Sequence, residues 1–112
     1  MSLKHFTEYI HFNGIRWNPI DLDNGLQLSI QASVLHYCDP RMNGLDADRY
    51  YAWEVAVLKK GQVVNPQCGE EFFSESDNVY PYLAADNVQD LFVALNRLTE
   101  YEVDKIEVEE EE

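Results

Sequence analysis

The clearest pattern along the chain is a strict alternation of hydrophobic and polar side chains over residues 26–33. Its hydrophobic positions are Leu26, Leu28, Ile30 and Ala32, with Gln or Ser between them. Successive side chains of a strand point to opposite faces of a sheet, so the alternation predicts a strand with one buried and one exposed face. The same period recurs from Tyr51 through Trp53, Val55 and Val57, which predicts a second long strand.

Turn residues predict how these strands are joined. Lys59-Lys60-Gly61 is expected to form a hairpin that returns through Gln62-Val63-Val64. Near the N-terminus, Asn13-Gly14 is typical of a two-residue type I′ turn. In that register Phe12 faces Ile15, Ile10 faces Trp17, and all four side chains share one side of the ribbon. The segment at residues 65–78 is irregular and acidic, and Pro81 confines residues 79–82 to a sheet edge.

Helical spacing appears late in the chain, at positions i, i+3, i+4, i+7 and i+10. These positions are Val88, Leu91, Phe92, Leu95 and Leu98, which predicts one amphipathic helix over about residues 85–99. Lys105–Val108 is expected to add a short strand. The predicted fold class is therefore α+β: a single domain over residues 1–106, with an antiparallel β-sheet and the C-terminal helix packed on one face. Residues 107–112 are expected to form an acidic disordered tail.

Charge is distributed very unevenly. Fourteen of the 21 acidic residues lie between Glu70 and Glu112, where Arg97 and Lys105 are the only bases, and the net charge of the whole chain is −13. This asymmetry excludes direct binding to nucleic acid or to an anionic membrane, because both would be repelled. No segment reaches the roughly 18 consecutive apolar residues of a membrane span, and no signal peptide is evident. The expected location is the cytoplasm.

No pattern in the chain compels a chemistry. His36 and Cys38 lie two residues apart on one face of a strand, but a zinc site needs further ligands at suitable spacing, and a Cys–His dyad lacks an orienting group. The two cysteines are expected to be reduced thiols. We therefore predict no catalytic residue, no cofactor and no metal site.

Residues suited to contact another protein are easier to find. The acids Glu70, Glu71, Glu75 and Asp77 form a dense group, and clustered carboxylates can imitate the phosphates of a nucleic acid. Tyr50 and Tyr51 lie on opposite faces of the second long strand, so at least one of them is expected to be exposed and to anchor an interface. These six are the candidate partner-binding residues, and the expected partner is a protein with a basic surface.

One string resembles a family of small bacteriophage and prophage proteins of unknown function. It comprises Ser29-Ile30-Gln31-Ala32-Ser33, then His36-Tyr37-Cys38 and Pro40-Arg41, followed by the strand from Tyr51 to Val55 and the segment from Val79 to Leu95. The similarity covers roughly residues 26–98; the segment between Val57 and Val79 and the acidic tail depart from it. The resemblance implies a phage or prophage setting inside a bacterial host cell, and it carries no catalytic residue.

Two functional hypotheses follow. The first is a non-enzymatic phage-type binding protein, an acidic mimic of nucleic acid that inhibits a host nucleic-acid-handling protein. The alternative is a structural or accessory phage protein that self-associates or docks through an aromatic face of its sheet. The sequence leaves the oligomeric state open, a homodimer included.

Overall fold

The two alternating segments pair with each other at the centre of a five-stranded antiparallel sheet. In the computed structural model, which describes residues 3–108, they are β2 (Leu26–Gln31) and β3 (Ala52–Lys59). Leu28 lies opposite Val57 and Ile30 lies opposite Val55, and all four side chains are fully buried. Both strand predictions are confirmed, because each hydrophobic set falls on the same face of the sheet.

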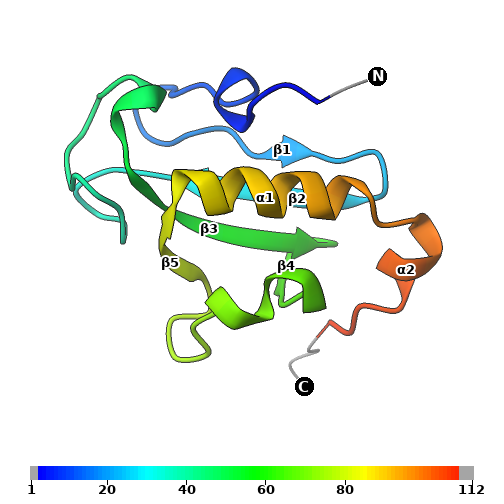
Figure 1. The fold of residues 1–112 in the computed structure, drawn as a ribbon. Helices are drawn as coiled ribbons and strands as arrows, with labels where there is room; N and C mark the ends of the chain where they lie inside the picture. The colour runs from blue at the N-terminus through cyan, green and yellow to red at the C-terminus, as the bar shows by residue number, and fades with distance from the viewer. Residues whose placement is uncertain (1–2, 109–112) are drawn as a thin grey trace.

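Three short strands complete the sheet (Figure 1). β1 (Ile20–Asp21) pairs with the free side of β2. β4 (Gln62–Val64) and β5 (Tyr80–Ala84) both pair with β3, on the side away from β2, at its end and its beginning respectively. The predicted hairpin is confirmed: Lys60 and Gly61 have φ of 53° and 78°, as a type I′ turn requires. Pro81 does lie in an edge strand.

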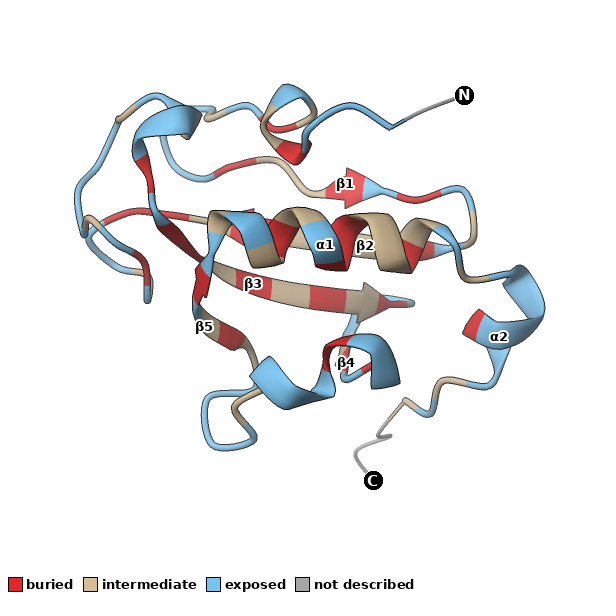
Figure 2. Cartoon of the chain, in the orientation of Figure 1, coloured by how far each residue is buried: buried red, intermediate tan, exposed pale blue. Residues whose placement is uncertain are grey.

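One helix, α1 (Ala85–Asn96), covers one face of the sheet (Figures 1 and 2). Its buried side chains are Val88, Leu91, Phe92 and Leu95, four of the five that the spacing predicted. The chain thus forms a single α+β domain, and its radius of gyration, 13.5 Å, is close to the ~13 Å expected for a compact chain of this length. None of the helices within residues 3–108 is long and apolar enough to cross a membrane.

The chain beyond α1 differs from the prediction. Residues Glu100–Asp104 form a second helix, α2, with Thr99 and Glu102 in a reciprocal capping box. The predicted strand at Lys105–Val108 is wrong, because Lys105 is the C-cap of α2 and the Ile106 amide still donates to the Val103 carbonyl. Most of the predicted acidic tail, residues 109–112, lies outside the described residues.

The first hairpin is also displaced from its predicted register. Phe12 pairs with Trp17 in an isolated bridge, and the Asn13 amide donates to the Arg16 carbonyl. The corner residues are therefore Gly14 and Ile15, one residue later than predicted. This slip leaves Ile15 84% exposed, whereas Trp17 is buried. Ile15 now lies at a corner of the turn and no longer faces Phe12, so the predicted four-residue apolar side does not form, although Ile10 and Trp17 are both buried.

Three short 3₁₀ helices lie in the connections: η1 (Phe6–Glu8), η2 (Ala47–Arg49) and η3 (Gln67–Phe72). η1 packs near α1, so the N-terminal segment joins the core through Phe6, which is fully buried. η3 lies within the segment that the sequence marked as irregular, and it contacts both α1 and β5.

Candidate protein-interaction surface

The two candidate tyrosines differ in exposure: Tyr51 lies at the surface and Tyr50 lies in the core. Tyr51 is 72% exposed, whereas Tyr50 is 2% exposed and packs edge-on against Trp17. The Tyr50 hydroxyl donates to the Met42 carbonyl at 2.7 Å. One of the pair is therefore exposed, as expected, but Tyr50 belongs to the core and offers no surface to a partner.

A local bulge explains this reversal. The amides of Tyr51 and Ala52 both donate to the carbonyl of Asp39, at 2.7 and 3.1 Å. Two residues on one strand then oppose a single residue on the other, as in a β-bulge, and the alternation restarts. Ala52 and Trp53 are consequently both buried, and Tyr51 falls outside the face that the simple period assigned to it.

Glu70 and Glu71 are presented to solvent by η3. This short helix is pressed against the core at Gly69, where an added Cβ would lie 3.0 Å from both the Leu91 Cδ1 and the Tyr80 hydroxyl. The close approach requires glycine at this position. The packing of η3 on α1 and β5 fixes the place of the two carboxylates, although the residues themselves are exposed.

Glu75 and Asp77 lie in the turn that follows η3. Ser74 pairs with Val79 in an isolated bridge, and Asn78 closes the turn at φ 60°. The Ser74 hydroxyl donates to the Asp77 carboxylate at 2.9 Å, which orients that side chain. Both acids are exposed, so all four of the candidate carboxylates are available to a partner.

Six further acids lie on α1, on α2 and in the segment that follows α2: Asp86, Asp90, Glu100, Glu102, Asp104 and Glu107. Like the first four, they are all exposed. Within residues 3–108 the one basic side chain in close contact with a carboxylate is His36, whose Nε2 lies 3.7 Å from Glu54, elsewhere in the molecule. The ten carboxylates from Glu70 to Glu107, which we call the acidic face, are therefore not neutralised by neighbouring cations.

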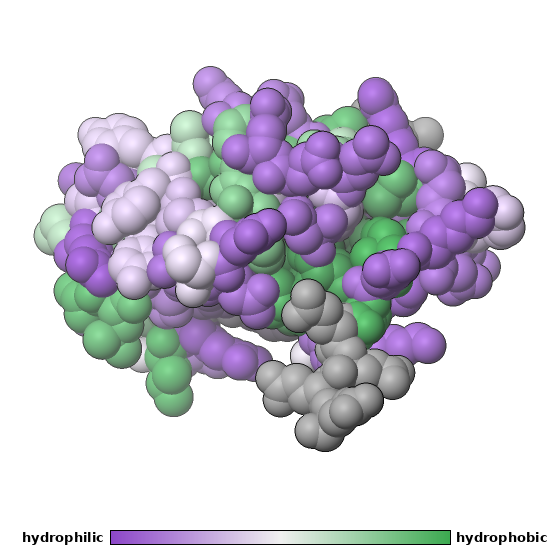
Figure 3. All heavy atoms as spheres, turned by 90° about the horizontal axis from the view of Figure 1, so that it is seen from below, coloured by the Kyte–Doolittle hydropathy of each residue, from purple (hydrophilic) through white to green (hydrophobic). Residues whose placement is uncertain are grey.

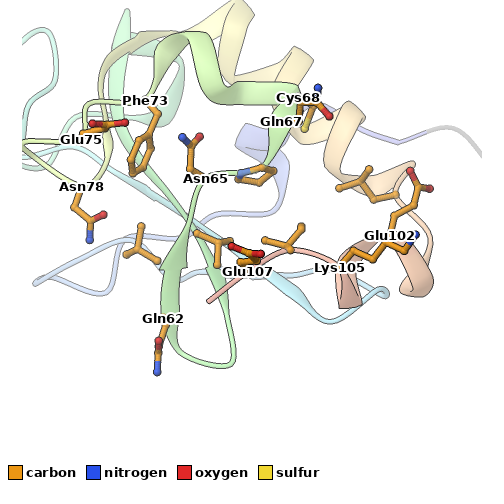
Figure 4. Close-up of a pocket in the computed structure, with 15 residues that line it drawn as sticks. Gln62, Asn65, Gln67, Cys68, Phe73, Glu75, Asn78, Glu102, Lys105 and Glu107 are labelled. Atoms are coloured by element: carbon orange, nitrogen blue, oxygen red, sulfur yellow. The ribbon is translucent and has the colours of Figure 1, made fainter. Parts of the chain in front are cut away.

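A groove of about 970 Å³ runs through this region (Figure 4). Residues 62–68 form its middle; Phe73, Glu75 and Asn78 line it on one side, Glu102 and Lys105 line it on the other, and Glu107 lies between them. Its apolar lining includes the half-buried side chains of Val63, Phe73, Leu98 and Ile106. Seen from below, the molecule shows hydrophobic side chains between hydrophilic ones (Figure 3). The groove thus combines apolar lining residues with a polar rim that carries a net negative charge.

The C-terminal wall of the groove is held in place by two contacts. Glu102 accepts hydrogen bonds from the Thr99 amide and hydroxyl, both at 3.1 Å. Lys59, at the end of β3, donates from Nζ to the carbonyl of Ile106 at 2.7 Å. The groove is therefore built from segments that are distant in the sequence, and no local sequence motif predicts it.

A second exposed surface lies around the start of β5. Tyr37 and Tyr82 stack at 5.7 Å between ring centroids, and the Arg41 guanidinium lies 5.6 Å from the centre of the Tyr37 ring. Leu35 is 84% exposed in the same loop. We call Leu35, Tyr37, Tyr51 and Tyr82 the aromatic end; of these four, only Tyr51 is among the candidate partner-binding residues.

Ser33, His36 and Glu54 together have the composition of a hydrolase triad. The Ser33 hydroxyl lies 2.6 Å from His36 Nδ1, and His36 Nε2 lies 3.7 Å from Glu54. The sequence patterns did not indicate that Glu54 lies beside His36. The Ser33 hydroxyl also accepts from the Leu35 amide at 3.0 Å, and Ser33 is only 6% exposed. The contact between Ser33 and His36 closes a tight turn, and Ser33 lines neither the groove described above nor the smaller one beside Leu22 and Leu58.

The two thiols differ in environment. Cys38 is buried and donates to the Ser33 carbonyl at 3.3 Å, whereas Cys68 is exposed at the groove. Burial raises the pKa of the Cys38 thiol above its usual value. Over residues 3–108 no three His, Cys, Asp or Glu side chains gather as a metal site would require.

Comparison of the chain with protein-family models, with curated proteins and with solved structures gave no match.

Proposed function

We propose that this chain is a non-enzymatic binding protein that docks through its acidic face on a basic surface of another protein. In the phage or prophage setting, the partner is a host protein that handles nucleic acid, and the bound chain inhibits it by occupying the site for phosphates. The observation that carries the proposal is the set of ten exposed carboxylates from Glu70 to Glu107, none of them in a side-chain ion pair within the described residues.

The number of exposed acids supports such mimicry. The ten exposed carboxylates lie on a molecule whose longest extent is 39 Å. Duplex DNA carries one charge per ~1.7 Å of its axis, and one of its strands carries one per ~3.4 Å. Ten carboxylates on a molecule of this size are comparable in number to the phosphates of a short nucleic-acid segment. Individual exposed ion pairs add little affinity, but a field of one sign speeds association and excludes wrong partners.

A matched pair of charge variants tests the proposal. The chain and both variants are used to capture proteins from a bacterial lysate, and bound proteins are eluted with a salt gradient. One variant neutralises four acids of the acidic face: Glu70→Gln, Glu71→Gln, Glu75→Gln and Asp77→Asn. The control removes the same charge from exposed acids elsewhere: Glu8→Gln, Asp23→Asn, Asp46→Asn and Asp48→Asn.

The expected result is a captured nucleic-acid-binding protein that elutes at moderate salt and is lost with the first variant only. Equal capture by both variants would contradict the proposal. A truncation after Val108 examines the four terminal glutamates separately. A cut after Asp104 is less suitable, because it also removes Ile106, whose carbonyl accepts from Lys59.

A second candidate function rests on the aromatic end. Exposed aromatic side chains anchor many protein interfaces, and here Tyr37 and Tyr82 lie beside an edge strand. In this alternative the chain is a structural or accessory phage protein that self-associates or docks on another phage component. Sedimentation at rising concentration tests it: association that persists in high salt and is lost on Leu35→Ser with Tyr51→Ser would favour this role.

A further inference from the structure

The outer edge of β4 carries backbone groups that have no partner strand. Within the described sheet β4 pairs only with β3. Lys59 and Gln62 flank the two-residue turn, so they form a hydrogen-bonded pair, and the next pair, Leu58 with Val63, is a non-hydrogen-bonded one. The amide and carbonyl of Val63 therefore point away from β3. Unpaired groups on an edge strand are a template for another strand.

This edge borders the groove. Val63 and the next two residues, Val64 and Asn65, all line it, and Figure 4 shows β4 passing through its centre. An extended segment that paired with β4 would lie along the apolar lining residues and pass between the rim residues. Because a strand rises about 3.3 Å per residue, a segment of four residues would span roughly 13 Å.

The charged side chains at the rim of the groove favour a basic ligand. Three exposed carboxylates, those of Glu75, Glu102 and Glu107, line the groove. Lys105 is the one cation among the lining residues, and its Nζ lies 4.3 Å from the centre of the Tyr101 ring. Exposed amides of Gln62, Asn65 and Asn78 can bond to a peptide backbone. A basic segment is therefore favoured over an acidic or a neutral one.

We propose that the groove beside β4 binds an extended, Lys- and Arg-containing segment of the partner protein, which adds to the sheet as a strand next to β4. This inference rests on the proposed function and specifies how the basic partner is held: main-chain hydrogen bonds from β4 supply affinity, and the carboxylates read the alternate basic side chains. A second copy of this chain fits less well, since no two of its Lys or Arg residues lie two positions apart, as alternate side chains of a strand require.

The test uses the full chain and synthetic peptides. The probe is a short peptide in which Lys or Arg alternates with Val. The first control peptide has the same sequence with alternate backbone amides N-methylated, which blocks pairing along one edge and keeps the charge. The second control replaces the basic residues by Glu. Binding is followed by changes in backbone amide NMR signals and by protection of Cys68 from alkylation, since Cys68 lines the groove and Cys38 is buried.

We expect the basic peptide to shift the signals of residues 62–65 and 105–107 and to slow alkylation of Cys68. N-methylation on the pairing edge should weaken binding at least tenfold, and the Glu peptide should not bind. Val63→Pro is the matching protein variant: proline is tolerated on an edge strand where its missing N–H faces outward. This variant should weaken binding of the basic peptide by a similar factor. The peptide controls keep the test valid if this variant folds poorly.

Two results would overturn the inference, and they differ in what they say of the proposed function. Peptide binding that depends on salt but is indifferent to N-methylation, with signals shifted across the whole acidic face, would reject strand addition and leave the acidic face as the binding surface. If no basic peptide binds while the lysate capture still depends on the four acids, the partner offers a folded basic surface. The groove then is not its binding site.

Discussion

Lys59 Nζ donates to the carbonyl oxygen of Ile106 at 2.7 Å, and it also reaches the carbonyl of Asp104 at 3.2 Å. Lys59 is the last residue of β3 and is only 8% exposed, although its neighbours on the same face are hydrophobic. The burial of its ammonium group is offset by carbonyl groups at and beyond the end of α2, where the helix dipole also favours a cation. This contact ties the C-terminal segment to the sheet.

Lys59→Met should therefore destabilise the fold and loosen the groove wall. The substitution keeps an unbranched apolar stem and removes the charged donor, so the Asp104 and Ile106 carbonyls lose their partner. Hydrogen bonds to charged groups contribute about 1.5–3 kcal/mol, and we expect a loss of about 2 kcal/mol in the free energy of unfolding. Urea denaturation measures it. Lys60→Gln, an exposed change at the adjacent turn position, is the control and should change stability by less than about 0.5 kcal/mol.

Packing at Gly69 gives a second prediction. In Gly69→Ala the new Cβ would lie 3.0 Å from the Leu91 Cδ1 and from the Tyr80 hydroxyl, so η3 has to move away from α1. Overpacking of this kind costs about 1–3 kcal/mol, and urea denaturation should show a loss in that range. Gln67→Ala, an exposed change on the same short helix, should be close to neutral. Equal effects of the two changes would contradict the close packing of η3.

The regular elements could be predicted because their patterns are local and self-consistent. The alternation of Leu26, Leu28 and Ile30 and the helical spacing of α1 each select one face, and the structure buries that face. The predicted register of the first hairpin was wrong, and the reason is again local. The Asn13 side chain accepts from the amides of Ile15 and Arg16, both at 2.9 Å, which moves the turn one residue along the chain.

The candidate site was less accessible to sequence reasoning. The exposed acids were found by charge alone, but the groove depends on α2, which the prediction missed. Its signal was present, since Thr99 and Glu102 have the spacing of a capping box. The burial of Tyr50 could not be read from the alternation, because the bulge opposite Asp39 arises from a contact between residues that are twelve and thirteen positions apart in sequence.

Two tyrosine hydroxyls with opposite environments give a third prediction. The Tyr80 side chain is fully buried, and its hydroxyl has no hydrogen-bond partner among the described residues, whereas the Tyr50 hydroxyl bonds to Met42 and Leu45. Tyr80→Phe should therefore leave stability unchanged or raise it, because it removes an unsatisfied buried group. Tyr50→Phe should cost about 1–2 kcal/mol, because it leaves the Met42 carbonyl and the Leu45 amide without their partner.

Thermal unfolding of both variants, measured against the parent chain, provides this comparison. The two substitutions delete the same atom, so the change in side-chain volume is matched, and a difference between them reports hydrogen bonding. If Tyr80→Phe is the more destabilising of the two, the Tyr80 hydroxyl has a partner in solution that accounts for its burial.

Stability should fall on the alkaline side, because burial raises the pKa of Cys38 and of Tyr80 in the folded state. As pH rises, these groups ionise first in the unfolded chain, near pH 9 for the thiol and near pH 10 for the phenol. Ionisation favours the unfolded chain, so the free energy of unfolding is unaffected below those pH values and falls as pH rises above them. The slope reaches at most about 1.4 kcal/mol per pH unit for each group.

Urea midpoints between pH 7 and 10.5 measure this loss, and Cys38→Ala separates the contribution of the thiol. That variant loses some packing at every pH, so its informative property is the slope: we expect a shallower decline than in the parent between pH 9 and 10. Cys68→Ala should change the slope less, because this residue is exposed and solvent screens its charge. Parallel curves for Cys38→Ala and the parent would show that the Cys38 thiol ionises to the same extent in the folded and the unfolded chain, so that its burial does not raise its pKa.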